Sequence, residues 1–228
     1  GLLEDLDPVA ALRGDEGKVH AGAAAADYAA MRRAVIAGVN GDNAAKARML
    51  GEMMETYPNS KWISTAMLEQ ALAYMETEDN DKAIKTLNNL SRKFPNSPET
   101  RTAMLQMALL YSKQGNAAAA DEAYKSVISK WPSSDEAQTA SDELRRIYAS
   151  RGELSQLSDF LRRVPGAPQL DDSEVEQLTY DAAASEYAAG GSGRKLVQYV
   201  ENYPDGKYVA QALRDIAEYQ FSDENRPD

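Results

Sequence analysis

The stretch FPNS at residues 94–97 decides the fold, because the same aromatic-Pro-polar-small pattern recurs along the chain. It appears as YPNS at 57–60 and as WPSS at 131–134, in both cases 37 residues away, and again as YPDG at 203–206. Self-similarity at a fixed step of this length indicates a repeat protein, in which each unit is one supersecondary element. The chain is therefore expected to consist of several copies of one such unit.

Each unit is predicted to be two helices joined by a short turn. Residues 97–114 place apolar side chains at helical spacing until Gly115 interrupts the pattern, which predicts a first helix. Residues 117–130 carry a second apolar stripe, and Pro132 ends it because proline disfavours helical geometry in the residue before it. A turn serine is expected to cap each following helix, at Ser60, Ser97 and Ser134.

The unit resembles the tetratricopeptide repeat (TPR), a family of 34-residue helical hairpins. That family has small residues at its eighth and twentieth positions, which Ala108 and Ala120 match here; Ala71 and Ala83 match them one unit earlier. Its tyrosine at the eleventh position and its proline at the thirty-second are matched by Tyr111 and Pro132. The step of 37 and the YPNS turns look like those of bacterial envelope TPR proteins of the YbgF and BamD groups. They look even more like those of large multi-repeat envelope TPR proteins, of which this chain would be a segment.

The resemblance implies an all-α fold, an α-α superhelix or TPR-like solenoid of about five helical hairpins plus a final helix. We expect an N-terminal segment with a partial helix at 1–20, a repeat array at 21–221 and a C-terminal tail at 222–228. The array divides into units near 21–58, 59–95, 96–132, 133–165 and 170–204, followed by a helix at 206–221. Substitutions at the glycines of 190–193 should cost little, whereas large residues at Ala108 or Ala120 should overpack the helix crossing.

Composition excludes several classes of function. A net charge of −11 argues against a nucleic-acid partner, because neutralising phosphates requires clustered Lys and Arg. The chain has no cysteine, which removes disulfides, thiol catalysis and cysteine-ligated zinc. No apolar stretch approaches the length of a membrane helix, so we expect no direct membrane insertion.

The sequence contains no arrangement that points to catalysis, a metal or a cofactor. His20 is the only histidine and reads as an exposed linker residue, while the glycine-rich stretch 190–195 lacks the spacing of a phosphate loop. The densest acidic group, at 171–176, reads as the charged start of a helix rather than as a metal site. We therefore expect a protein that is not an enzyme and needs no cofactor. A cryptic hydrolase is the remote alternative, and it would require acidic residues that converge in one pocket with perturbed pKa values.

Stacked helical hairpins form a groove, lined by their first helices, that can hold a peptide or a partner helix. The leading interpretation is a non-enzymatic scaffold or adaptor of the bacterial envelope, periplasmic or outer-membrane associated. Its partner would be a protein, a peptide or the adjacent repeats of a longer chain. The alternative is a structural spacer with no binding site of its own. A scaffold should expose an apolar or charged patch of several hundred Å² along the first helices, and a spacer should not.

The resemblance also implies which side chains line the groove. The chaperone-type TPR clamp holds a partner's carboxylate with Lys and Asn, whereas this chain has leucines at those places, so we expect no such clamp. The apolar row fits either a partner surface or core covered by neighbouring repeats, and the second is favoured because most apolar helix stripes are core. The candidate groove residues are Thr65, Leu68, Leu72, Met75, Thr102, Leu105, Leu109, Ser112, Asp142 and Arg146.

Overall fold

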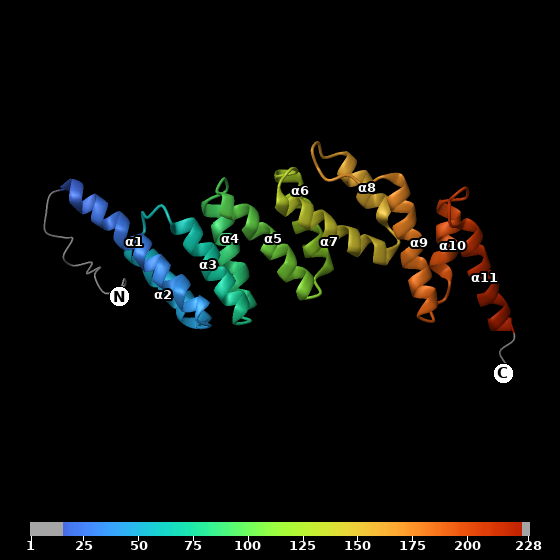
Figure 1. The fold of residues 1–228 in the computed structure, drawn as a ribbon, viewed down its shortest axis with the longest axis horizontal. Helices are drawn as coiled ribbons and strands as arrows, with labels where there is room; N and C mark the ends of the chain where they lie inside the picture. The colour runs from blue at the N-terminus through green and yellow to red at the C-terminus, as the bar shows by residue number, and fades with distance from the viewer. Residues whose placement is uncertain (1–15, 225–228) are drawn as a thin grey trace. The chain divides into compact units, whose positions relative to one another are not determined.

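The structure is a computed structural model that describes residues 16–224, with side chains described for residues 25–218. Within this range every regular element is a helix, and the helices are labelled in chain order in Figure 1. They are α1 (Glu16–Val39), α2 (Asn43–Thr56), α3 (Ile63–Glu76), α4 (Asn80–Lys93), α5 (Pro98–Lys113), α6 (Ala117–Lys130), α7 (Asp135–Arg151), α8 (Leu154–Arg162), α9 (Asp172–Ala188), α10 (Arg194–Asn202) and α11 (Val209–Glu224). The all-α fold of five helix pairs and a final helix is therefore confirmed.

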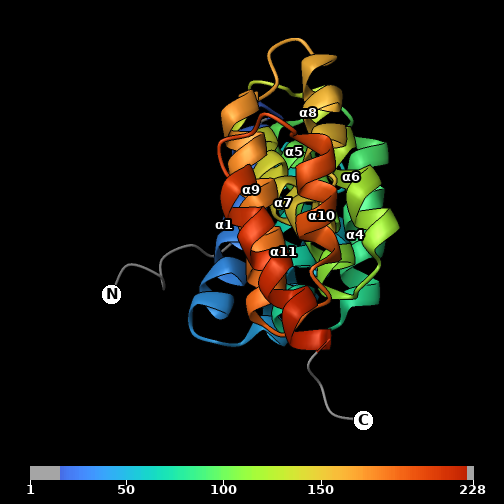
Figure 2. The same ribbon diagram turned by 90° about the vertical axis from the view of Figure 1, so that its right-hand side faces the viewer.

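The chain divides into two compact units, residues 1–123 and 124–228. In the first unit α1 packs on α2, α2 on α3, α3 on α4 and α4 on α5, and the first helices also contact one another, α1 with α3 and α3 with α5. In the second unit α7 packs on α8, α8 on α9 and α9 on α10, and α7 also contacts α9. Figure 2 shows α10 and α11 side by side, as their contacts require. Each unit is thus a stack in which a helix packs on helices one or two places along the chain.

The step of 37 residues is visible in the helix ends. The second helices α2 and α4 begin at the side-chain caps Asp42 and Asp79, each of which accepts the N–H three residues later. Asn116 accepts the N–H of Ala119 in the same way before α6. The second helices end at aromatic residues whose N–H donates to the carbonyl four residues earlier, at Tyr57, Phe94 and Trp131. The 37-residue register therefore extends to the alanine-rich first hairpin, α1 and α2, where the sequence pattern is weakest.

The turn serines do not all act as caps. Ser134 accepts the N–H of Ala137 as predicted, and Ser97 holds the cap position of α5 but contacts Thr100 instead. The prediction for Ser60 was wrong, because α3 begins only at residue 63. The turn continues through Trp62, whose ring lies 5.0 Å from that of Tyr28 on α1, and Ser60 donates its hydroxyl hydrogen bond to buried Asp27 instead.

We expect Ser60→Ala to lower the free energy of unfolding by about 1 kcal/mol, because it removes a hydroxyl that donates to the buried Asp27 carboxylate and accepts the N–H of Trp62. Asp27 keeps its hydrogen bond from the N–H of Tyr28, which limits the loss. The change in the free energy of unfolding can be measured by urea denaturation, followed by the fluorescence of Trp62 in a Trp131→Phe background. Asn88→Ala, at an exposed position of α4 in the same unit, is the control. Equal midpoints for the two variants would show that the Ser60 hydroxyl adds nothing to stability.

Small residues occupy the helix crossings, as the resemblance implied. Ala71, Ala83, Ala108 and Ala120 are all 0% exposed. In the first unit one core cluster, named here the α3–α5 core, joins buried side chains of three successive helices. Its members are Ile63, Met67, Ala71, Ala83, Leu87, Leu90, Ala103, Met107 and Leu110.

The core at the C-terminal end of the second unit is built from tyrosines. The Tyr180 and Tyr208 rings stack with centroids 4.7 Å apart, and the Tyr199 hydroxyl donates to Glu176 Oε1 at 2.7 Å. Burial, and then this hydrogen bond, raise the pKa of Tyr199. A Cβ at Gly206 would lie 2.6 Å from Glu176 Oε1, which explains why the fourth turn ends in glycine where the other three have serine.

The glycine turn between α9 and α10 is less tolerant than the sequence indicated. Gly190 and Gly193 have φ angles of +86° and +65°, a region that strains residues with a Cβ. A Cβ at Gly191 would lie 2.7 Å from the carbonyl oxygen of Glu186. The expectation that substitutions here cost little was therefore wrong, because three of the four positions depend on the absence of a side chain.

Candidate protein-binding groove

The candidate groove in the first unit lies along α3 and α5, which contact each other. On α3, Leu68, Leu72 and Met75 are half-buried, and on α5 Leu109 is half-buried as well. Leu105 differs, because only 7% of its surface is exposed. The two helices therefore present a row of apolar side chains that keeps part of its surface in solvent.

Part of this row also belongs to the core. Leu68 and Met75 pack against the α3–α5 core from its edge, where they are partly buried. The buried side of such a leucine stabilises the fold, and its other side remains in solvent. Burial alone therefore allows both interpretations of the row, partner surface and covered core.

A polar contact ties the two helices together at the start of the row. The Thr65 hydroxyl donates to Glu99 Oε1 at 2.8 Å, from α3 to the first turn of α5. Burial raises the pKa of Glu99, but hydrogen bonds from its own N–H and from the Thr65, Ser97 and Ser64 side chains outweigh burial, and the net pKa is lowered. Thr102 and Ser112, the remaining polar candidates on α5, are half-buried.

Two candidate residues belong to the second unit. Asp142 and Arg146 are both exposed on α7. Asp142 accepts a hydrogen bond from Gln138 Nε2 at 3.1 Å, and Arg146 pairs with Glu143 one turn earlier on the same helix. Both therefore make local contacts on the surface of α7.

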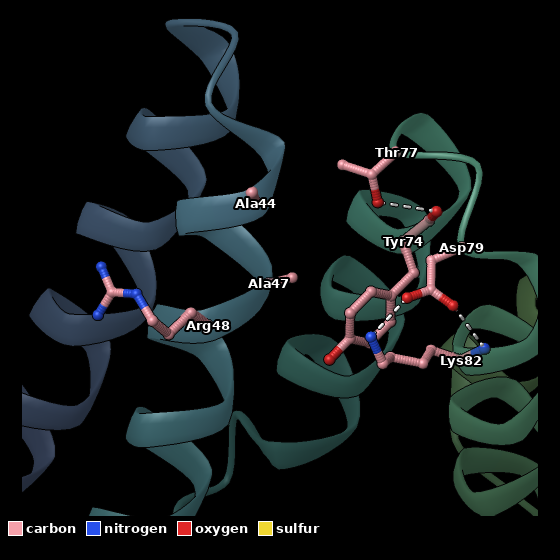
Figure 3. A pocket seen from close by; sticks show the side chains of 7 residues that line it. All are labelled: Ala44, Ala47, Arg48, Tyr74, Thr77, Asp79 and Lys82. Carbon is pink, nitrogen blue, oxygen red and sulfur yellow. Dashed lines mark hydrogen bonds and ion pairs between the residues drawn. The ribbon is translucent and has the colours of Figure 1, made fainter.

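A pocket that the sequence did not indicate lies between α2 and the α3–α4 hairpin, with a volume of about 420 Å³ (Figure 3). Ala47 forms part of one side, and Tyr74 with the Asp79–Lys82 ion pair forms the other. The hydrogen bond from Lys82 lowers the pKa of Asp79, which is the opposite of what a catalytic acid needs. The sequence feature that could have indicated this pocket is the small side chain of Ala47. The corresponding position of the next unit, 37 residues later, holds Ile84, whose larger side chain packs against the α3–α5 core.

The acidic group at the start of α9 acts as the sequence predicted. Asp171 caps the helix by accepting the N–H of Glu174 at 2.8 Å, and this hydrogen bond, followed by that from Ser173, lowers its pKa. Among residues 25–218 no cluster of three or more His, Asp or Glu side chains could hold a metal ion. His20 lies within α1, but its side chain is outside the described residues.

None of the described helices combines the length and the apolar character that crossing a membrane requires. The fold is similar to that of a tetratricopeptide repeat protein from Parabacteroides merdae, with a TM-score of 0.53 and 13% identity over 86% of this chain and 72% of the other. It is also similar to BtubC (BKLC) from P. vanneervenii, with a TM-score of 0.50 and 15% identity over 91% of this chain and 85% of the other. At these identities the likeness shows the fold alone, and it confirms the TPR prediction. No curated protein matches the sequence.

A protein-family model gives the more specific match. The model is that of YfiO, described as an outer membrane lipoprotein, and it matches residues 24–216. This range includes most of α1, all of α2 to α10 and part of α11. The chain therefore belongs to the YfiO family of outer membrane lipoproteins.

Proposed function

We propose that this protein is a non-enzymatic interaction scaffold of the bacterial envelope, and that the groove along α3 and α5 binds a protein or peptide partner. The family description supports association with the envelope, and the TPR fold is one of protein-interaction scaffolds. The observation that carries the proposal is the row formed by Leu68, Leu72 and Leu109, apolar side chains that remain partly exposed on two contacting first helices. A partner helix or extended peptide would cover this exposed surface.

The partner is expected to bind through apolar contacts rather than through its terminal carboxylate. The groove positions that hold Lys and Asn in the chaperone-type clamp carry leucines here, at 68, 72, 105 and 109. The charged candidates Asp142 and Arg146 lie on α7 in the second unit, where both are exposed. Exposed charges of this kind contribute to association rate and specificity more than to affinity.

The test uses three folded proteins, each as bait to capture partners from envelope extract. The binding of each protein to the identified partner is then measured with the partner in purified form. The groove variant is Leu72→Glu/Leu109→Glu. The matched control is Val197→Glu/Leu213→Glu, which places the same charges at exposed apolar positions of α10 and α11. Circular dichroism establishes that all three are folded.

We expect the parent and the control to bind the same partner, and the groove variant to bind at least tenfold more weakly, roughly the loss of one central apolar contact. Equal binding by all three proteins would place the site elsewhere. If no envelope protein binds the parent specifically, the chain is a spacer. If the groove variant unfolds, the leucines are core and the proposed groove is wrong.

A further inference from the structure

In the first unit the second helix of one hairpin covers a face of the first helix of the next, α2 on α3 and α4 on α5. At the α2–α3 junction, Lys46 Nζ of α2 pairs with Glu69 Oε2 of α3 at 2.6 Å, with only 12% and 28% of the two side chains exposed. Gln70 Nε2 of α3 donates to the carbonyl of Ala47 on α2 at 2.8 Å, and Ala73 is 0% exposed. These contacts define the face of α3 that α2 covers.

The same face of α1 has no covering helix among the described residues. The caps Asp42 and Asp79 set the register between the first two hairpins, so the positions of Glu69, Gln70 and Ala73 correspond, 37 residues earlier, to Arg32, Arg33 and Ile36. Both arginines are exposed, and 38% of Ile36 is exposed where its counterpart Ala73 is fully buried. We call Arg32, Arg33 and Ile36 the leading face of α1.

The charge on the leading face of α1 is the reverse of that on α3. At the α2–α3 junction the covering helix supplies the cation and the first helix supplies the carboxylate. On α1 the first helix supplies Arg32 and Arg33, and no carboxylate among residues 25–218 forms an ion pair with either. Arg32 instead lies 6.0 Å from the ring centroid of Tyr28 on its own helix. A helix that covers this face would therefore be complementary if it carried acidic residues.

We propose that the leading face of α1 is a docking site for an acidic amphipathic helix of another polypeptide, packed as α2 packs on α3. A carboxylate of that helix pairs with Arg32, and its apolar stripe covers Ile36. This site is separate from the groove, because Arg32, Arg33 and Ile36 do not occupy the positions of α1 that correspond to the groove residues of α3. The two proposals can therefore fail independently.

The chain itself provides the probe. A fluorescent peptide with the sequence of residues 43–56 reproduces the helix that covers α3, and the change Lys46→Glu gives it the carboxylate that α1 requires. The change Arg48→Lys allows a lactam to Glu52 that holds the peptide helical, because these two positions are exposed and one turn apart. The same lactam peptide with Lys46 retained is the control peptide. Fluorescence anisotropy measures the binding of both to the full 228-residue chain.

We expect the Lys46→Glu peptide to bind roughly fivefold more tightly than the control peptide, the effect of exchanging one repulsive charge pair for an attractive one. The Arg32→Glu protein should reverse this order. Arg92→Glu, the same charge change at an exposed site on α4, should leave the order unchanged, as should the groove variant Leu72→Glu/Leu109→Glu.

Four results would overturn the proposal. The first is equal binding of the two peptides, or no binding of either. The second is a preference that survives Arg32→Glu. The third is a parent chain that sediments as a dimer and becomes monomeric with Ile36→Lys, because the face would then belong to a second copy. The fourth is a rise in peptide affinity when residues 1–15 are removed, because the chain's own segment would then be the occupant.

Discussion

Replacing Leu87 with alanine is expected to lower the free energy of unfolding of the first unit by about 2–5 kcal/mol. Leu87 lies on α4, is 0% exposed, and packs in the α3–α5 core with Met67 and Leu90. Truncation removes apolar contacts and leaves a cavity that close-packed neighbours on α3 and α5 fill only in part. Few single substitutions in this chain should have a larger effect.

The effect of Leu87→Ala can be measured by urea denaturation monitored through Trp62 fluorescence in the Trp131→Phe background, where Trp62 is the single tryptophan and reports on the first unit. Asn88→Ala is the control, because Asn88 is the exposed neighbour of Leu87 and its replacement should change stability by no more than about 0.5 kcal/mol. A loss for Leu87→Ala as small as that for Asn88→Ala would mean that α4 does not pack on α3 in this register.

The reverse change, from small to large, should also destabilise. Ala83→Leu is expected to lower the free energy of unfolding by about 1–3 kcal/mol, because Ala83 is 0% exposed where α4 crosses α3 beside Ala71. The extra carbons have no space unless the helices separate. The same expectation applies to Ala108 and Ala120, which are equally buried.

Ala118→Leu is the matched control for Ala83→Leu, since Ala118 is exposed in the first turn of α6. Denaturation should give similar midpoints for this control and the parent, and a lower midpoint for Ala83→Leu. A gain in stability from Ala83→Leu would show that the crossing holds unfilled space and that the small residue is not required for close approach.

The positions of helices were predictable because local residues set them. The predicted helix at 97–114 is observed at Pro98–Lys113, and the one at 117–130 is observed at those bounds. Proline at the turns and glycine between paired helices act on the backbone of their immediate neighbours, so their effect can be read without knowing the fold. Fixed spacing then extends each assignment to the next unit.

Contacts between distant residues were not predictable in the same way. Ser60 fails to cap α3 because Trp62 packs against Tyr28, more than thirty residues earlier. Gly191 is a different case, because the carbonyl of Glu186 that it approaches is only five residues earlier, at the end of α9. The Ser60 error therefore arose where tertiary packing overrode a sound local rule, whereas the Gly191 error lay in the local geometry of a helix end.

The candidate groove shows the same limit in the first unit. Leu105 and Leu109 are one turn apart on α5 and look alike in the sequence, yet the first is buried and the second half-buried. Exposure of this kind depends on which neighbouring side chains reach over each leucine. The sequence could therefore nominate the row, but it could not rank its members.

The pattern of helix contacts has a consequence for how quickly the protein folds. The helix pairs that contact each other within a unit are one or two places apart along the chain, so most native contacts close short loops. Chains with mainly local contacts fold in roughly microseconds to milliseconds, because little loop-closure entropy is lost before contacts form. A newly made N-terminal hairpin would already hold its native neighbours while the C-terminal helices were still being synthesised.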